Sequence, residues 1–160
     1  MLGEPTSMPR APFDILVVPY RTSDAGAYEY AVLHRPESDM WRFVAGGGEG
    51  DETPFLAALR EASEEGGIRA ERGDWLELDA TASIPRTAFP TARWPETVCV
   101  VPEHCFAVKL RDDLVLSAEH DRCEWLDYES AHTRLTWDSN RVALWELRER
   151  LHAKKRPIIG

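Results

Sequence analysis

The chain has 160 residues and a formal net charge of −9, from 28 acidic and 19 basic side chains. A hydrophobic fraction of 43% fits an ordinary soluble domain, and no apolar run approaches the roughly 18–20 residues that cross a membrane. The acidic balance argues against a general nucleic-acid binder, which needs a basic surface to replace condensed counterions.

The two ends and the cysteines suggest one domain in a reducing compartment. Residues 1–12 carry three prolines and lack the cationic and apolar segments of a secretion signal, so we expect a flexible tail, then one domain over 13–155, in the cytoplasm. Cys99, Cys105 and Cys123 form no C-x-x-C pair, which argues against a zinc knuckle or a disulfide framework. Cys99 and Cys105 share parity on an expected strand, which favours burial.

In chain order, β-rich segments alternate with turns. The segments 13–20 and 28–34 flank a turn at "SDAG" and predict a hairpin, and 40–45 predicts a third strand that ends at three glycines. Further strands are expected at 74–80, 97–110 and 123–128, around a connector at 85–95 that bears proline and arginine. We therefore expect a mixed sheet covered on both faces.

Two helices are expected. The first begins with Thr53 as N-cap and Pro54 as first helical residue, and it stops at Gly66-Gly67. The second covers 138–155, with Asp138 or Ser139 as its cap. Apolar residues recur along it at helical spacing: Val142, Trp145 or Leu144, and Leu151.

The first helix has an acidic stripe. At about 100° per residue, Glu61, Glu64 and Glu65 share one side, while Phe55, Leu59 and Ala62 lie on the side that would pack on the sheet. A solvated helix face is the ordinary interpretation of such a cluster. Like charges at this spacing repel, however, and they stand near the negative end of the helix dipole. The stripe therefore predicts a divalent cation, and carboxylate oxygens favour Mg²⁺ or Mn²⁺.

A glycine-rich segment precedes this helix. Residues 46–52, "GGGEGDE", hold four glycines, which lets the backbone come close to a ligand. Most glycine loops are simply turns, but beside a carboxylate helix this one indicates open backbone at a metal site.

Residues 46–68, "GGGEGDETPFLAALREASEEGGI", resemble the Nudix box: a glycine, five residues, a glutamate, seven residues, then Arg-Glu, an aliphatic, any residue, Glu-Glu, any residue, a glycine and an aliphatic. Ala62 is smaller than the usual aliphatic. The positions in register are Gly46, Glu52, Arg60, Glu61, Glu64, Glu65, Gly67 and Ile68.

The resemblance extends over most of residues 13–150. The segments "FDILVVPY", "AVLHR", "AEHDRCEWLD" and "SNRVALWEL" look like the bacterial branch that hydrolyses dihydroneopterin triphosphate and deoxynucleoside triphosphates. It implies an α/β/α sandwich with a mixed sheet and a divalent-metal-dependent hydrolase acting on a small nucleotide or pterin polyphosphate. Nucleic acid and membrane partners are not expected, and the chain is expected to be a monomer or homodimer.

The resemblance also implies roles for individual residues. Glu61 and Glu65 would bind Mg²⁺ or Mn²⁺, and Glu64 would be a further ligand or orient water. Arg60 would hold the glutamates in place, while Glu52 would be structural. Glu119, outside the box, is the candidate third ligand or general base; on its own it would be an exposed bystander.

Other residues are candidates for substrate contact. Gly46 and Gly47 would lie against phosphate. His34 and Arg35 end a strand that faces the box, and Arg86 and Arg93 in the connector would clamp phosphate; for all four, an ordinary surface role is the alternative. Trp94, expected to be exposed beside Pro95, would stack on a base or pterin ring, whereas Trp41 is expected in the core. His104 and His120 lack metal-ligand spacing and are expected at the surface.

The sequence leaves the substrate open. Deoxynucleoside triphosphate or dihydroneopterin triphosphate is favoured, with ADP-ribose, nucleotide sugars and dinucleoside polyphosphates as alternatives. A non-catalytic nucleotide sensor of the same fold and a structural protein with an accidental acidic cluster are the remaining hypotheses.

Overall fold

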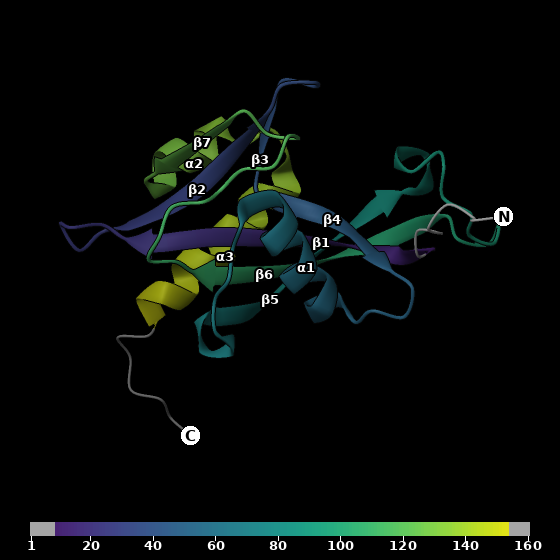
Figure 1. Ribbon diagram of the computed structural model, residues 1–160, viewed down its shortest axis with the longest axis horizontal. Helices are drawn as coiled ribbons and strands as arrows, with labels where there is room; N and C mark the ends of the chain where they lie inside the picture. Colours follow the sequence, from purple (N-terminus) through teal and green to yellow (C-terminus); the bar gives the residue numbers. More distant parts are fainter. Residues whose placement is uncertain (1–8, 154–160) are drawn as a thin grey trace, which may run out of the picture.

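A seven-stranded mixed sheet forms the middle layer of the structure, a computed structural model that describes residues 9–153 (Figure 1). The order along the sheet is β3-β2-β1-β6-β5, while β4 pairs with β1 and β7 pairs with β2. The strands are β1 (Arg10–Thr22), β2 (Tyr28–Arg35), β3 (Met40–Arg42), β4 (Val44–Glu49), β5 (Trp75–Pro85), β6 (Val100–Lys109) and β7 (Arg122–Leu126). The helices are α1 (Pro54–Gly66), α2 (Tyr128–Arg134) and α3 (Asp138–Ala153), with short 3₁₀ turns η1 (Arg72–Asp74) and η2 (Arg86–Ala88).

Strand β1 lies at the centre and is apolar on both faces. Leu16 and Val18 belong to the core that α2 and α3 cover, whereas Ile15 and Val17 belong to the core beneath α1. A strand buried on both sides needs a continuous apolar run, which "ILVV" provides. The expected α/β/α sandwich with a mixed sheet is therefore confirmed, with α1 on one face and α2 and α3 on the other (Figure 1).

The first hairpin is also confirmed. Strands β1 and β2 pair antiparallel, with Tyr20 opposite Tyr30. Gly26 has a φ of 82° in the turn between them, a conformation that glycine adopts without strain.

The third predicted strand is divided into two strands, and the position predicted for its three glycines was wrong. Phe43 separates β3 from β4, and its backbone N–H donates to Asn140 Oδ1 of α3 at 3.0 Å instead of to a strand. The three glycines that were expected to end the strand lie inside β4, where Gly46 pairs with Ile15 and Gly47 with Asp14. Their missing side chains make room for other residues, as described below.

Several smaller expectations need correction. Strand β1 starts at Arg10, so residues 10–12 are not a tail; residues 1–8 and 154–155 of the predicted tail and domain lie outside the described residues. The three cysteines are free. Cys105 is buried as expected, but Cys99 is exposed, because it lies just before β6 and not within it.

The helical predictions were incomplete. Helix α2 was not predicted, because a helix of seven residues that buries only Ala131 has too short a pattern. On α3, Leu144 and Leu151 are buried as expected, but Val142 and Trp145 are 53% and 54% exposed. Within residues 9–153, none of the helices is long and apolar enough to span a membrane.

Candidate metal and active site

Helix α1 presents the glutamates, and local signals fix both of its ends. Thr53 Oγ1 accepts a hydrogen bond from the Leu56 N–H at 3.3 Å, with Pro54 as the first helical residue. The helix stops where Gly67 takes a φ of 61°, the left-handed conformation that favours glycine. Ala62, smaller than the usual residue of the motif, is fully buried against the sheet.

Arg60 is the hub of this acidic region. Its Nε and Nη2 donate to the Glu52 carboxylate at 2.9 and 3.0 Å, and Nη2 also donates to the Gly47 carbonyl at 2.7 Å. Its Nη1 reaches Glu61 at 3.0 Å and Glu64 at 3.3 Å. One guanidinium thus ties the start of α1, strand β4 and the acidic stripe together, and it lowers the pKa of Glu52. These contacts agree with the positioning role expected of Arg60, which stays a prediction.

Glu61 lies directly against the glycine strand. A Cβ atom at Gly46 would be 2.1 Å from Glu61 Cδ, so this position accepts only glycine unless the carboxylate moves. The pKa of Glu61 is raised to about 7, chiefly by burial and also by the charges of Glu64 and Glu119, while Arg60 opposes the rise. The Cβ position of Gly47 is occupied by the Arg10 guanidinium instead. Both glycines therefore make room for side chains of this chain; their expected contact with phosphate stays a prediction.

Glu65 is the most deeply buried of the three stripe glutamates, at 4% exposure. Its Oε2 accepts from the Ala45 N–H at 3.0 Å, and Arg42 Nη2 donates to its Oε1 at 3.4 Å. Burial raises the pKa of Glu65 to about 8, although Arg42 and the Ala45 N–H lower it. Glu64, by contrast, points outward with 58% of its side chain exposed.

Glu119 reaches the site on a long connection between β6 and β7. This strap (residues 110–121) crosses the C-terminal end of α1, where the Val115 N–H donates to the Gly66 carbonyl at 2.8 Å and the Ser117 N–H donates to the Glu65 carbonyl at 3.2 Å. Oxygen atoms of Glu65 and Glu119 and a ring nitrogen of His120 then lie within 4.8 Å of one another. The structure thus brings two of the four nominated carboxylates, Glu65 and Glu119, together with His120, whereas Glu61 lies against Gly46 and Glu64 points outward.

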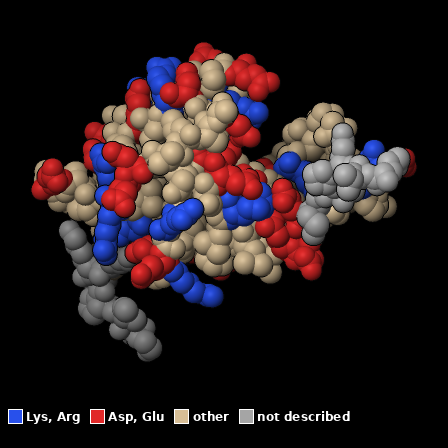
Figure 2. All heavy atoms as spheres, viewed as in Figure 1, with Lys and Arg blue, Asp and Glu red and all other residues tan. Residues whose placement is uncertain are grey.

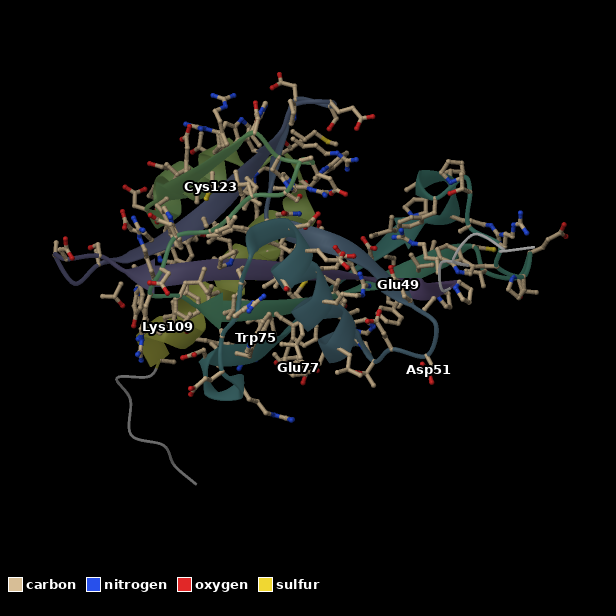
Figure 3. The ribbon with its side chains drawn as sticks, viewed as in Figure 1. Glu49, Asp51, Trp75, Glu77, Lys109 and Cys123 are labelled. Atoms are coloured by element: carbon tan, nitrogen blue, oxygen red, sulfur yellow. The ribbon has the colours of Figure 1, made fainter. Side chains whose placement is uncertain are left out.

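The carboxylates around α1 are numerous enough that a cation is needed to balance their charge. Acidic side chains gather on the face that carries α1 and the loop before it (Figure 2). Glu49, at the end of β4 beside α1, adds one more carboxylate 3.5 Å from Arg60, whereas Asp51 lies on the loop that follows (Figure 3). A bound cation favours the ionised form of buried carboxyl groups and so offsets the rise in their pKa. The oxygen-rich donor set fits Mg²⁺ or Mn²⁺, with Glu61, Glu65 and Glu119 as the residues that would hold it.

His34 does not present a free imidazole to the site. It is 5% exposed, and its Nδ1 and Nε2 lie 2.7 Å from carboxylate oxygens of Asp121 and Asp39, whose hydrogen bonds raise its pKa. Its ring also packs on Trp41, with 4.8 Å between centroids. The surface position given as the alternative was wrong, because Asp39, Asp121 and Trp41 enclose the ring, while contact of His34 with phosphate stays a prediction. Arg35 lies 3.6 Å from Glu37, and its substrate role stays a prediction.

The connector residues organise their own loop. Arg86 donates to the backbone carbonyls of Trp94 at 2.7 Å, Pro95 at 2.5 Å and Val98 at 3.1 Å, which employs the guanidinium expected to clamp phosphate. Trp94 was expected to be exposed but is 8% exposed, because its Nε1 donates to the Arg10 carbonyl at 2.7 Å. Arg93 is exposed and stays a candidate for substrate contact.

Sequence reasoning missed three buried polar residues near this site. His120, expected at the surface, is 5% exposed, and burial lowers its pKa to about 4. Asp14 of β1 stands opposite Glu103 of β6 in the strand register, and burial raises the pKa of Asp14 to about 7. An acidic residue at the start of the apolar run "ILVV" was the available indication for Asp14, but nothing local distinguishes Glu103.

Comparison with known proteins identifies the family. Residues 16–145 match the model of the NUDIX domain. The chain therefore belongs to the Nudix family, as a Nudix hydrolase domain. The structure of a Nudix hydrolase from Listeria monocytogenes is 43% identical, with a TM-score of 0.79 over 90% of this chain and 97% of that one.

Two further relatives carry names of activities. The dihydroneopterin triphosphate pyrophosphohydrolase of E. coli is 26% identical, with a TM-score of 0.68 over 88% of this chain and 99% of that one. An RNA pyrophosphohydrolase from Gluconobacter oxydans is 33% identical over 107 residues, which are 60% of this chain and 61% of the relative. The chain spans between 29% and 66% of the length of the curated relatives it matches.

Proposed function

We propose that this chain is a divalent-metal-dependent pyrophosphohydrolase that cleaves a phosphoanhydride bond in a nucleoside triphosphate or a related compound in which two groups are joined through a diphosphate. The observation that supports it most is the convergence of Glu61, Glu65 and Glu119 beside the Gly46 backbone, with Arg60 bonded to Glu52 and Glu61. A bound cation would neutralise phosphate charge and acidify a water molecule.

Each residue of the site has a proposed role. Glu61 and Glu65 hold the cation, and Glu64 is a further ligand or orients water. Glu119 is a third ligand or takes the proton from the attacking water, and Glu64 is the alternative base; both side chains are exposed to solvent beside Glu61 and Glu65. Arg60 keeps the carboxylates in place and touches no reacting atom.

Deoxynucleoside triphosphates and dihydroneopterin triphosphate are the favoured substrates, and a small-molecule partner suits the acidic surface better than a nucleic acid. Similarity to the E. coli dihydroneopterin triphosphate enzyme over 99% of that chain supports this choice. Similarity to RNA pyrophosphohydrolases makes 5′-triphosphorylated RNA a necessary member of the test panel.

The test is a substrate screen with Mg²⁺ or Mn²⁺ over deoxynucleoside triphosphates, dihydroneopterin triphosphate, ADP-ribose, nucleotide sugars, dinucleoside polyphosphates and triphosphorylated RNA. Release of pyrophosphate or phosphate should depend on the metal, and Glu61→Gln and Glu65→Gln should each lower turnover about 100-fold or more. Wild-type rates in both variants would refute the scheme. A nucleotide that raises the melting temperature without any product would instead identify a sensor.

A further inference from the structure

His120 is a buried histidine whose ring has no hydrogen-bonding partner. It is 5% exposed, and within residues 9–153 neither Nδ1 nor Nε2 finds a donor or acceptor. Leaving polar groups buried and unpaired is costly, so native proteins satisfy nearly all of them. An imidazole with two bare nitrogens therefore indicates a ligand that the protein atoms do not supply.

His34 provides the internal comparison. It is equally buried, yet each of its ring nitrogens lies 2.7 Å from a carboxylate oxygen. This chain thus satisfies a buried histidine fully where the ring is enclosed by protein alone. The residue that follows His120 belongs to the surroundings of His34, because the Asp121 N–H donates to the His34 carbonyl and the Asp121 carboxylate bonds the His34 ring.

The ring of His120 is directed at the proposed cation site. One of its nitrogens, an oxygen of Glu65 and an oxygen of Glu119 lie within 4.8 Å of one another. Ligands of a small divalent ion lie at about 2.0–2.2 Å from it, so opposite ligands are separated by about 4.3 Å at most. Three ligands spaced evenly around such an ion are about 3.8 Å apart at most, so a closure of up to about 1 Å would bring these atoms to ligand spacing. Glu119 lies on the strap with its side chain exposed, which leaves it room for that movement.

The backbone holds His120 in this position. Its N–H donates to the Ser117 carbonyl at 3.2 Å, and the Ser117 N–H in turn donates to the Glu65 carbonyl at 3.2 Å. The same short run of backbone bonds therefore places Glu119 and His120 against the helix residue that would share the ion with them.

We propose that His120 supplies a nitrogen ligand to the divalent ion held by Glu65 and Glu119, a role that rests on the metal site of the proposed function. Imidazole suits transition metals, whereas Mg²⁺ prefers oxygen. The site should therefore bind Mn²⁺ or Co²⁺ in preference to Mg²⁺ by a larger factor than carboxylates alone would give, and His120 should account for that preference.

The experiment uses the full-length protein loaded with one equivalent of Mn²⁺. Electron spin echo spectroscopy detects directly coordinated ¹⁴N, and isothermal titration calorimetry gives the affinities for Mn²⁺ and Mg²⁺. We expect ¹⁴N coupling in the wild type and its loss in His120→Gln. We also expect Mn²⁺ affinity to fall about 10- to 100-fold in His120→Gln, with Mg²⁺ affinity changed much less. His104→Gln, a partly exposed residue of β6, is the matched control and should keep the coupling.

Wild-type protein that binds Mn²⁺ without ¹⁴N coupling would overturn the proposal, as would coupling that persists in His120→Gln. The wild-type spectrum decides the matter even if the variant does not fold. Metal-dependent hydrolysis without ¹⁴N coupling would leave the proposed function standing and remove His120 from the site. Coupling without hydrolysis of any substrate would support the ligand and remove the proposed function.

Discussion

The buried carboxyl group of Glu65 should make the metal-free protein less stable as the pH rises. Burial raises its pKa from 4.5 to about 8, so folding favours the neutral form. The native state then binds more protons than the unfolded state between these pH values, and the free energy of unfolding decreases as the pH increases through this window. At 1.36 kcal/mol per pH unit, the loss amounts to roughly 3–5 kcal/mol between pH 4.5 and pH 8.

The measurement is guanidinium unfolding in the presence of EDTA from pH 5 to pH 9, followed by the fluorescence of the six tryptophans. Glu65→Gln cannot ionise, and it should remove roughly 3–5 kcal/mol of the wild-type decrease. Glu64→Gln, at a side chain that is 58% exposed, should keep the wild-type profile and serves as the control. Adding Mn²⁺ at pH 8 should stabilise the wild type far more than Glu65→Gln. Identical pH profiles for the wild type and Glu65→Gln would refute the reasoning.

Three further substitutions test the geometry around the site. Gly46→Ala places a Cβ atom 2.1 Å from the present position of Glu61 Cδ, so the carboxylate must move. Turnover should drop about 100-fold, while circular dichroism should show that the fold is retained. Normal turnover would contradict this close approach. Arg60→Lys loses the two-point bond to Glu52 and should cost about 2 kcal/mol in chemical unfolding, whereas an unchanged midpoint would show that the guanidinium fork is dispensable. Arg86→Ala removes three hydrogen bonds from the arginine side chain to backbone carbonyls of the connector, so proteolysis within residues 86–98, mapped by mass spectrometry, should become faster while Mn²⁺ affinity stays the same. No change in cleavage would mean that other contacts hold the loop.

Helix α1 was predictable because its determinants are local. Thr53, Pro54 and Gly67 act within a few residues of the helix ends, and the acidic stripe follows from the helical period alone. Its buried side was equally readable, since Phe55 and Leu59 are partly buried against the core beneath α1. Because the motif is confined to one helix and the strand before it, its spacing alone determines how most of its residues lie relative to one another.

Burial that depends on distant segments was not predictable in the same way. Trp94 is covered because its indole reaches the backbone of Arg10, which is far away in the sequence. His34 is enclosed by Asp39 and Asp121, and the latter arrives only with the strap. A single sequence does not show which distant segments lie side by side, so the exposure of these side chains could not be inferred from their neighbours in the sequence.

The strap has a consequence for how this site can vary. Its two bonds to the end of α1 come from the backbone N–H groups of Val115 and Ser117, which nearly any amino acid except proline can provide. What must be kept is the number of residues between those anchor points and Glu119. Replacements at exposed positions of the strap that only supply backbone, such as Val115, should therefore be tolerated. Inserting or deleting one residue after Ser117 would instead carry the Glu119 carboxylate out of reach of the helix.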